Sequence, residues 1–284
     1  MLFDLTNDIL SISDMSEFNL ERSANCGQAF RFNVFEDGYE AVILGRRFVF
    51  RKKGDILMIS NCKQGDAAFF SHYLDLDTDY KKIELWIEKD PVLSPCLPYA
   101  RGIRVFNQEP FETLISFIIS ANSNIGKIKR TIEKLSAMLG AEIATGYFAF
   151  PTAEAIAESD EAKLSAIGAG YRVPYIIKTA RAIVSGFSLE TIRDIPTDQA
   201  RKQLCTLMGV GPKVADCVLL FSLSHRNAFP MDVWMKRAVR ALYFKGTDEP
   251  DKKSLEEVIT SLGDEAGIIQ QYIFHYAREN KIGA

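Results

Sequence analysis

A lysine and an aspartate in the C-terminal third of this 284-residue chain carry its clearest chemical signal. Lys213 follows the turn sequence Gly209-Val-Gly211-Pro212, and Asp232 comes nineteen residues later, before a helical segment. A lysine amine can attack an electrophilic carbon and form a Schiff base, and a carboxylate stabilises positive charge that develops at such a carbon. Together the two residues predict covalent chemistry at a cationic carbon centre, and neither residue needs a metal.

Each of these residues also has a purely structural interpretation. A surface lysine at a turn can contact phosphate without reacting, and an aspartate before a helix can serve only as its cap. The turn does not predict a dinucleotide site, because the third glycine of that motif would fall on Val214 and a helix, not a strand, precedes it.

The turn favours a helix–hairpin–helix. Gly209 and Gly211 are expected to adopt backbone angles closed to other residues, and Pro212 suits the first position of the next helix. The N–H groups exposed at the start of that helix form an anion site that fits a DNA phosphate.

Charge along the chain supports a polyanionic ligand, although the formal net charge of −3 does not. Residues 201–245 hold eight basic residues and two acidic ones, a local charge of +6. Such a segment can steer DNA onto an otherwise acidic protein, and a solvated helix face is the alternative interpretation. The basic residues are Arg201, Lys202, Lys213, Arg226, Lys236, Arg237, Arg240 and Lys245.

Composition excludes several classes of protein. An apolar content of 47% and a charged content of 25% exclude a disordered chain. No apolar run approaches the roughly 18–20 residues of a membrane span, and the first residues lack the basic and apolar regions of a signal peptide. We expect a protein of the cytoplasm, with the nucleus as the alternative in a eukaryote.

The cysteines and histidines do not predict a resident metal or cofactor. The five cysteines are scattered, without a C-x₂-C pair or a four-cysteine cluster near the C-terminus, and the three histidines are dispersed. We therefore expect reduced thiols and no iron–sulfur cluster.

The elements that must position Lys213 and Asp232 form an α+β protein. Residues 1–104 predict an N-terminal antiparallel sheet domain, with strands at 39–44, 47–51 and 56–59. Residues 105–284 predict a mostly helical bundle, because apolar residues there recur at helical spacing. The expected helices are 109–121, 125–139, 173–185, 196–207, 212–223, 232–243, 253–262 and 265–279.

Three separated segments share their order with one known family. They are Asn25-Cys-Gly-Gln-Ala-Phe-Arg31, the G-I-R…S-F-I-I-S-A-N-S-N-I stretch over 102–125, and the G-V-G-P-K-V-A-D-C hairpin with Pro230-Met-Asp232. They resemble the 8-oxoguanine DNA glycosylases of the helix–hairpin–helix (HhH-GPD) superfamily. In that family a lysine at the hairpin marks members that also cleave the strand, so the resemblance implies a bifunctional glycosylase/AP lyase acting on double-stranded DNA with oxidised guanine.

The resemblance implies a role for each matching residue. Lys213 would be the nucleophile and Asp232 the stabilising carboxylate. The backbone carbonyl of Gly27 would accept a hydrogen bond from N7–H, which 8-oxoguanine carries and guanine lacks. The flipped base would be surrounded by Phe117, Cys217, Phe221, Gln270 and Phe274.

Further residues are implied to contact DNA: Asn122, Lys127, Tyr171, Arg172, Gly209, Gly211 and Trp234. Two of them depart from the eukaryotic family members, which have arginine at Lys127 and histidine at Trp234. Because lysine lacks the two-pronged guanidinium, we expect a looser preference for the base opposite the lesion. The carbonyls of Cys205, Leu207 and Val210 are implied to hold a monovalent cation.

Two alternatives remain at this point. One is an alkylated-base glycosylase of the same superfamily, which Lys213 disfavours because those relatives lack the hairpin lysine. The other is a non-catalytic DNA-binding protein with the same hairpin, which would need neither Gly27 nor Asp232. We expect a monomer that does not bind membranes.

Overall fold

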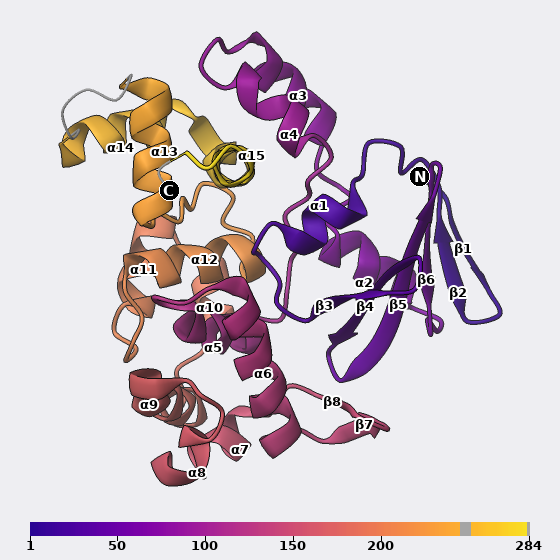
Figure 1. The fold of residues 1–284 in the computed structure, drawn as a ribbon, viewed down its shortest axis with the longest axis vertical. Coiled ribbons are helices and arrows are strands. Elements are labelled where there is room, and N and C mark those ends of the chain that lie inside the picture. The colour runs from indigo at the N-terminus through magenta and orange to yellow at the C-terminus, as the bar shows by residue number, and fades with distance from the viewer. Residues whose placement is uncertain (245–250, 283–284) are drawn as a thin grey trace.

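The computed structural model describes residues 1–244 and 251–282, so Lys245 of the basic segment lies outside the described residues. An antiparallel sheet forms one side of the molecule and a larger group of helices forms the other (Figure 1). The α+β architecture predicted from the sequence is confirmed.

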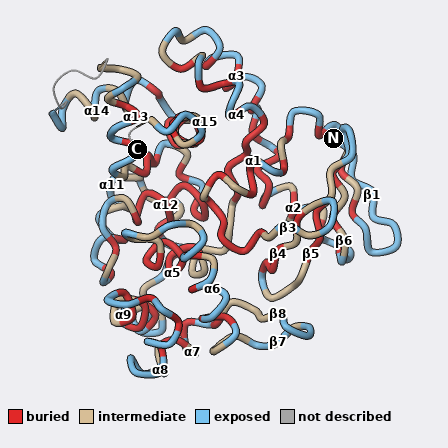
Figure 2. The backbone as a smooth tube through the Cα atoms, viewed as in Figure 1, coloured by how far each residue is buried: buried red, intermediate tan, exposed pale blue. Residues whose placement is uncertain are grey.

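The sheet has six antiparallel strands in the order β1-β2-β6-β5-β4-β3. Phe48 and Phe50 lie two residues apart on β5 and therefore point to the same face, where both rings contact Phe70 of α2 edge-on. β1 at one edge is exposed along its whole length (Figure 2). The strands are β1 (Phe3–Thr6), β2 (Ile9–Ile12), β3 (Phe32–Phe35), β4 (Gly38–Ile43), β5 (Arg46–Lys53) and β6 (Ile56–Ser60).

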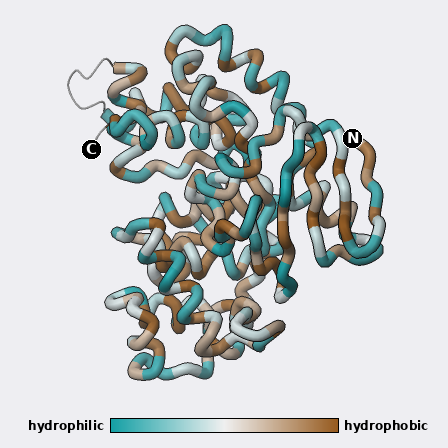
Figure 3. The backbone as a smooth tube through the Cα atoms, turned by 45° about the vertical axis from the view of Figure 1, so that its right-hand side comes forward, coloured by the Kyte–Doolittle hydropathy of each residue, from teal (hydrophilic) through white to brown (hydrophobic). Residues whose placement is uncertain are grey.

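The three predicted strands correspond to β4, β5 and β6, and their antiparallel meander is confirmed. Hydrophobic and hydrophilic stretches succeed one another along this sheet (Figure 3). Strands β1, β2 and β3 and four helices in the same region were not predicted from the sequence. These helices are α1 (Leu20–Asn25), α2 (Asp66–Tyr73), α3 (Tyr80–Lys89) and α4 (Leu97–Ala100), with a 3₁₀ turn at Ser94–Cys96.

The eight predicted helices of the second part are present, each within about three residues of its expected ends. They are α5 (Pro110–Ser120), α6 (Ile125–Leu139), α9 (Val173–Val184), α11 (Thr197–Leu204), α12 (Pro212–Ser222), α13 (Val233–Tyr243), α14 (Lys252–Ser261) and α15 (Ala266–Glu279). Short elements join them: β7 (Glu142–Ala144), β8 (Tyr147–Phe148), α7 (Ala153–Ala157), α8 (Glu161–Ser165) and α10 (Glu190–Arg193), with 3₁₀ turns at Gly170–Arg172 and Gly263–Glu265.

Two hydrophobic cores hold these elements together. The boundary between the two cores does not coincide with a single point along the sequence. The sheet and α2 enclose one core, which also takes in Phe106. The other core belongs to the helices, yet it includes Tyr80, Ile83 and Ile87 of α3 and Leu97 of α4. The division of the chain at residue 104 stays a prediction, but the residues just before it pack with the helices that follow it.

No helix among the described residues is long and apolar enough to cross a membrane.

Candidate active site

The glycine-rich turn joins α11 to α12, as the sequence predicted. Gly209 has a φ of +81°, and a Cβ added there would lie 2.7 Å from Cβ of Tyr175. Only glycine therefore fits both the backbone angle and the space. Thr179 on α9 donates a hydrogen bond to the carbonyl of Met208 (2.9 Å), which fixes the turn against the neighbouring helix.

The expectation for Gly211 was wrong. Its φ of −95° and ψ of 178° are extended angles that any residue adopts, and an added Cβ would meet no atom within 4 Å. Gly211 stands at the N-cap of α12, where it leaves the approach to the first N–H groups of that helix open. Its role in DNA contact stays a prediction, now for a reason of access and not of backbone strain.

Lys213 lies in the first turn of α12 and is half-buried. Its Nζ is 5.0 Å from the centre of the Phe117 ring and 3.5 Å from Oγ of Ser120, both on α5. The amine thus lies over an aromatic face, which attracts its charged form.

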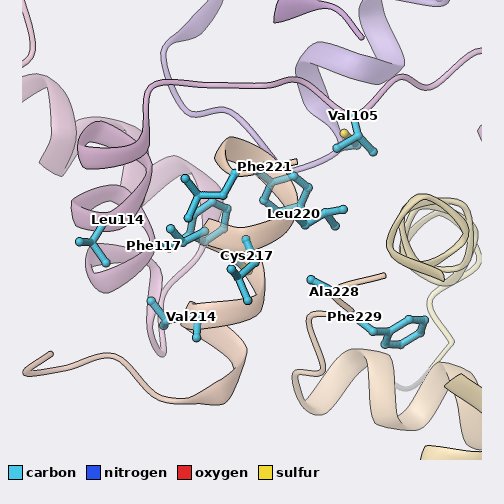
Figure 4. Close-up of a cluster of buried hydrophobic side chains, with 14 of the residues drawn as sticks. Val105, Leu114, Phe117, Val214, Cys217, Leu220, Phe221, Ala228 and Phe229 are labelled. Atoms are coloured by element: carbon cyan, nitrogen blue, oxygen red, sulfur yellow. The ribbon is translucent and has the colours of Figure 1, made fainter. Parts of the chain in front are cut away.

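Three aromatic rings form the wall beside this lysine. Phe117 stacks on Phe221 with centroids 5.4 Å apart and meets Phe30 edge-on at 5.3 Å. Phe117, Cys217 and Phe221 point toward one another between α5 and α12 (Figure 4). The structure therefore brings together Lys213 and three of the predicted base-binding residues.

Asp232 is the N-cap of α13, and its Oδ1 accepts a hydrogen bond from the backbone N–H of Met235 (2.8 Å). The cap function predicted as the structural alternative is therefore confirmed, and it orients the carboxylate. Burial raises the pKa of the Cys217 thiol to about 11, the charge of Lys213 acts against this shift, and the charge of Asp232 adds to it. Both charged side chains thus lie close enough to act on one thiol.

Gly27 forms a turn directly after α1, with a φ of +85°. A Cβ at this position would lie 3.7 Å from Cε1 of Phe274 and 3.8 Å from Cδ1 of Ile125. The ring of Phe274 from α15 therefore lies beside this turn, which brings together two predicted base-binding residues that are far apart in the sequence.

Gln28, the next residue, is buried and holds this turn in place through three hydrogen bonds of its side chain. Its Oε1 accepts a hydrogen bond from the N–H of Phe106 (2.7 Å), and its Nε2 donates to the carbonyls of Ser23 and Arg104 (2.9 and 2.8 Å). All three partners are backbone groups, so the glutamine of the Gly-Gln-x-Phe motif has a positioning function.

Gln270 on α15 is buried, and its amide already has protein partners. Nε2 donates to the carbonyl of Pro230 (3.1 Å), and Oε1 accepts from Nε2 of Gln271 (2.7 Å). The bond to Pro230 places Gln270 beside the segment that leads to Asp232. Nε2 keeps a second N–H and Oε1 a second lone pair, so contact with a base does not require either bond to be broken.

Asn122 and Tyr171 lie together at the surface. Asn122 follows α5 in the left-handed region (φ +48°), and its Nδ2 donates to the hydroxyl of Tyr171 (3.2 Å). Arg172 is buried: its Nε donates to the carbonyl of Ala121 (2.7 Å) and its Nη2 to the carbonyl of Asn122 (3.1 Å). In this structure Arg172 supports the Asn122 turn, and its implied contact with DNA stays a prediction.

Lys127 and Trp234 are both exposed, and 41% of Trp234 is accessible. Both side chains are therefore accessible to DNA, and their predicted contacts with it stay predictions.

Not every basic residue of the segment 201–245 is available to DNA. Nε of Arg201 lies 2.6 Å from Oδ1 of Asp216, which is buried, and a second nitrogen lies 2.5 Å from Asp198. Arg201 therefore balances carboxylates of its own hairpin, and this pairing is one that charge counting missed.

Ser120 and Phe30 also belong to the site, although neither was predicted from the sequence. Both stand in the quoted motifs, Ser120 two residues before Asn122 and Phe30 three residues after Gly27. Their spacing from assigned residues was the signal that could have identified them.

No group of three or more potential metal ligands occurs among residues 1–244 and 251–282. The five cysteines are unpaired thiols, of which only Cys205 is exposed. The Leu207 carbonyl accepts a hydrogen bond from the N–H of Val210 (3.2 Å). The predicted cation at this turn stays a prediction.

Two family models together match most of the chain. Residues 11–114 match the 8-oxoguanine DNA glycosylase N-terminal domain, and residues 115–263 match the HhH-GPD superfamily of base excision DNA repair proteins. The N-glycosylase/DNA lyase of Saccharomyces cerevisiae is 33% identical over 281 residues, covering 87% of this chain and 74% of the yeast protein. The probable N-glycosylase/DNA lyase of Methanothermobacter thermautotrophicus is 32% identical over 232 residues, 74% of each chain.

A solved structure agrees over the full length. The 8-oxoguanine glycosylase/lyase of Clostridium acetobutylicum, in complex with double-stranded DNA containing cytosine opposite to 8-oxoG, superposes with a TM-score of 0.94. It is 34% identical and the comparison covers 99% of both chains.

Proposed function

The chain belongs to the HhH-GPD superfamily of base excision DNA repair proteins, with the N-terminal domain of 8-oxoguanine DNA glycosylases, and we propose that it excises 8-oxoguanine from double-stranded DNA and then cleaves the strand. The observation that carries this function is the placement of Lys213. A half-buried amine at the start of the hairpin helix, against Phe117 and Ser120, combines a phosphate-binding turn with a nucleophile.

The amine of Lys213 supplies the covalent step. In its unprotonated form Nζ attacks C1′ of the damaged nucleotide, and the bond between C1′ and N9 breaks with its electron pair leaving on the base, which takes up a proton. The C1′–O4′ bond then breaks and O4′ takes up the proton that Nζ gives up, which opens the ring to a protonated Schiff base between C1′ and Nζ. Loss of a proton from C2′ expels the 3′ phosphate by β-elimination, which breaks the strand.

Asp232 stabilises the positive charge that develops on the sugar as the base departs. Its capping bond to Met235 holds the carboxylate in place before the substrate arrives. No reorganisation is then required when the charge appears, and preorganisation of this kind gives electrostatic stabilisation its effect.

Recognition of the base requires that it leave the helix stack, because a duplex covers the glycosidic bond. For the flipped base, the Gly27 carbonyl supplies a hydrogen-bond acceptor and the neighbouring ring of Phe274 supplies a stacking face. Guanine presents an acceptor at N7 to the Gly27 carbonyl, so it forfeits a hydrogen bond there at a cost of about 1–3 kcal/mol.

Borohydride trapping on a duplex with 8-oxoguanine opposite cytosine tests this function. We expect a covalent adduct with the native protein that disappears in Lys213→Gln and persists in Lys202→Gln, a control lysine exposed on the same hairpin. An undamaged duplex should give no adduct. Base release without any adduct would make the enzyme monofunctional, and absence of both would refute the proposed function.

We further propose that the protein acts as a monomer, because a single chain supplies every group named above. Light scattering of the protein bound to a damaged duplex should give the mass of one chain per duplex.

A further inference from the structure

The Gly27 turn is attached to α15 by a second contact besides Phe274. Nη1 of Arg278 donates a hydrogen bond to the carbonyl of Asn25 (2.8 Å), the last residue of α1. Phe274 and Arg278 are four residues apart on α15 and therefore share one face of the helix. One turn of α15 thus bonds Asn25 and places a ring beside Gly27.

The other nitrogen of Arg278 has weaker partners on its own helix. Nη2 lies 3.5 Å from Oε1 of Glu279 and 3.5 Å from Nδ1 of His275. These contacts are longer than a strong hydrogen bond, whereas the bond to Asn25 is short. The bond to Asn25 is therefore the directional contact of this side chain.

A glutamine holds the turn from the catalytic side. Nε2 of Gln108 donates to the carbonyl of Gln28 (2.8 Å), and the backbone N–H of Gln108 donates to the carbonyl of Phe221 at the end of α12 (2.8 Å). The carbonyls of Asn25 and Gln28 are thus both occupied, one from α15 and one from the segment attached to α12.

Two carbonyls lie between them, those of Cys26 and Gly27, and no hydrogen bond among the described residues goes to either. The bonds to Asn25 and Gln28 therefore hold the two ends of the turn, one on α15 and one on the segment attached to α12. The carbonyl of Gly27 is left for a ligand.

We propose that Arg278 is a positioning residue for damage recognition: it holds the Asn25 end of the Gly27 turn against α15 and so sets the distance between this turn and the ring of Phe274. The inference rests on the proposed function, in which that carbonyl accepts N7–H of 8-oxoguanine. Arg278 itself touches neither the base nor the sugar. A guanidinium suits this task, because several donors in one plane fix an orientation that a lysine ammonium leaves free.

The test separates recognition of the base from the chemistry on the sugar. Single-turnover rates are measured for release of 8-oxoguanine opposite cytosine and for cleavage of a duplex with a preformed abasic site. The variants are Arg278→Met, Arg278→Lys and Arg22→Met. Arg22 on α1 is the matched control, because it also donates to two backbone carbonyls, those of Arg101 (2.9 Å) and Pro98 (3.1 Å), away from the Gly27 turn.

We expect Arg278→Met to slow base release by about ten- to a hundredfold, as misplacement of a recognition group does, and to leave abasic-site cleavage within about twofold. Arg278→Lys should restore part of the loss. Arg22→Met should leave the ratio of the two rates unchanged, whatever its effect on the melting temperature.

Equal losses on both substrates, or the same ratio in Arg22→Met, would give Arg278 a general structural role and overturn the inference. Base release at the native rate in Arg278→Met would also overturn it, while leaving the proposed function intact. A native protein that releases no 8-oxoguanine but cleaves abasic sites would instead refute the proposed substrate, and this inference with it.

Discussion

The two sides of the site are built in different ways. On the catalytic side, Lys213 and Asp232 are positioned by their own helix ends: a glycine turn and a proline start α12, and Asp232 caps α13 with its own side chain. On the recognition side, Gly27 depends on bonds from Arg278 and Gln108, which lie far from it in the chain.

This difference separates what is local from what is long-range. A helix cap or a glycine turn needs only a few consecutive residues, so the backbone positions of Lys213 and Asp232 are set within short segments, whereas the Lys213 amine also packs on Phe117 of α5. The recognition side exists only when the sheet and the helices have come together. We therefore expect changes on the catalytic side to remove activity without unfolding the protein. Changes at the junction between the sheet and the helices should affect both activity and the free energy of unfolding.

The largest effect is expected for Asp232→Asn. Asparagine caps a helix about as well as aspartate, so the free energy of unfolding should change by less than about 0.5 kcal/mol. Loss of the negative charge should slow base release by about 10²- to 10³-fold. Denaturant unfolding and single-turnover rates measure the two effects.

Asp251→Asn is the control for that variant, because Asp251 caps α14 through a comparable bond to Ser254 (2.7 Å). It should be active and stable. Near-native base release by Asp232→Asn would show that the charge is not required and that the catalytic side is misassigned.

The next effect concerns the two glycines of the hairpin. Gly209→Ala places a Cβ 2.7 Å from Tyr175 at a positive φ, and we expect it to destabilise the protein by about 2 kcal/mol. Gly211→Ala meets no atom within 4 Å in an extended backbone, so its effect on unfolding should stay below about 0.5 kcal/mol. Equal destabilisation by the two substitutions would contradict the structure of the turn.

The smallest effect tests the junction through pH. Burial raises the pKa of Glu112 on α5 to about 7, although Arg31 acts in the opposite direction. The folded protein therefore holds this proton at pH values where the unfolded chain releases it. Stability is unaffected at about pH 4 and falls as pH rises toward 7, because the ionised carboxylate is disfavoured only in the folded state.

Glu112→Gln should remove that dependence. We expect it to raise the free energy of unfolding by about 1–2 kcal/mol at pH 8 and to change it little at pH 4. Glu133→Gln, at a more exposed position on α6, serves as the control. Parallel stability curves for native protein and Glu112→Gln between these pH values would rule out a buried carboxyl at the junction.

How far the sequence predicted this molecule follows the same division. The helix at 125–139 was predicted to its ends, because its apolar residues recur at helical spacing and Gly140 stops it. Lys213 and Asp232 were found because turn, proline and cap are local signals. Helices α1 to α4 were missed because they are short and their apolar residues serve cores assembled from distant segments.

The site shows the same limit in its details. Nothing near Arg172 in the sequence indicates that its guanidinium donates to carbonyls about fifty residues earlier, at Ala121 and Asn122. The bond from Gln270 to the carbonyl of Pro230 is equally remote. Such contacts depend on tertiary packing, and a single sequence without a structure does not specify them.

The shared core has a consequence for the order in which the chain folds during synthesis. α4 packs on α15, and Glu84 of α3 accepts a hydrogen bond from the Tyr272 hydroxyl (2.8 Å). A ribosome delivers α4 roughly 160 residues before α15, so the face of α4 that packs on α15 has no final partner while the middle of the protein is being made. α15 therefore closes a contact left open since about the first third of translation.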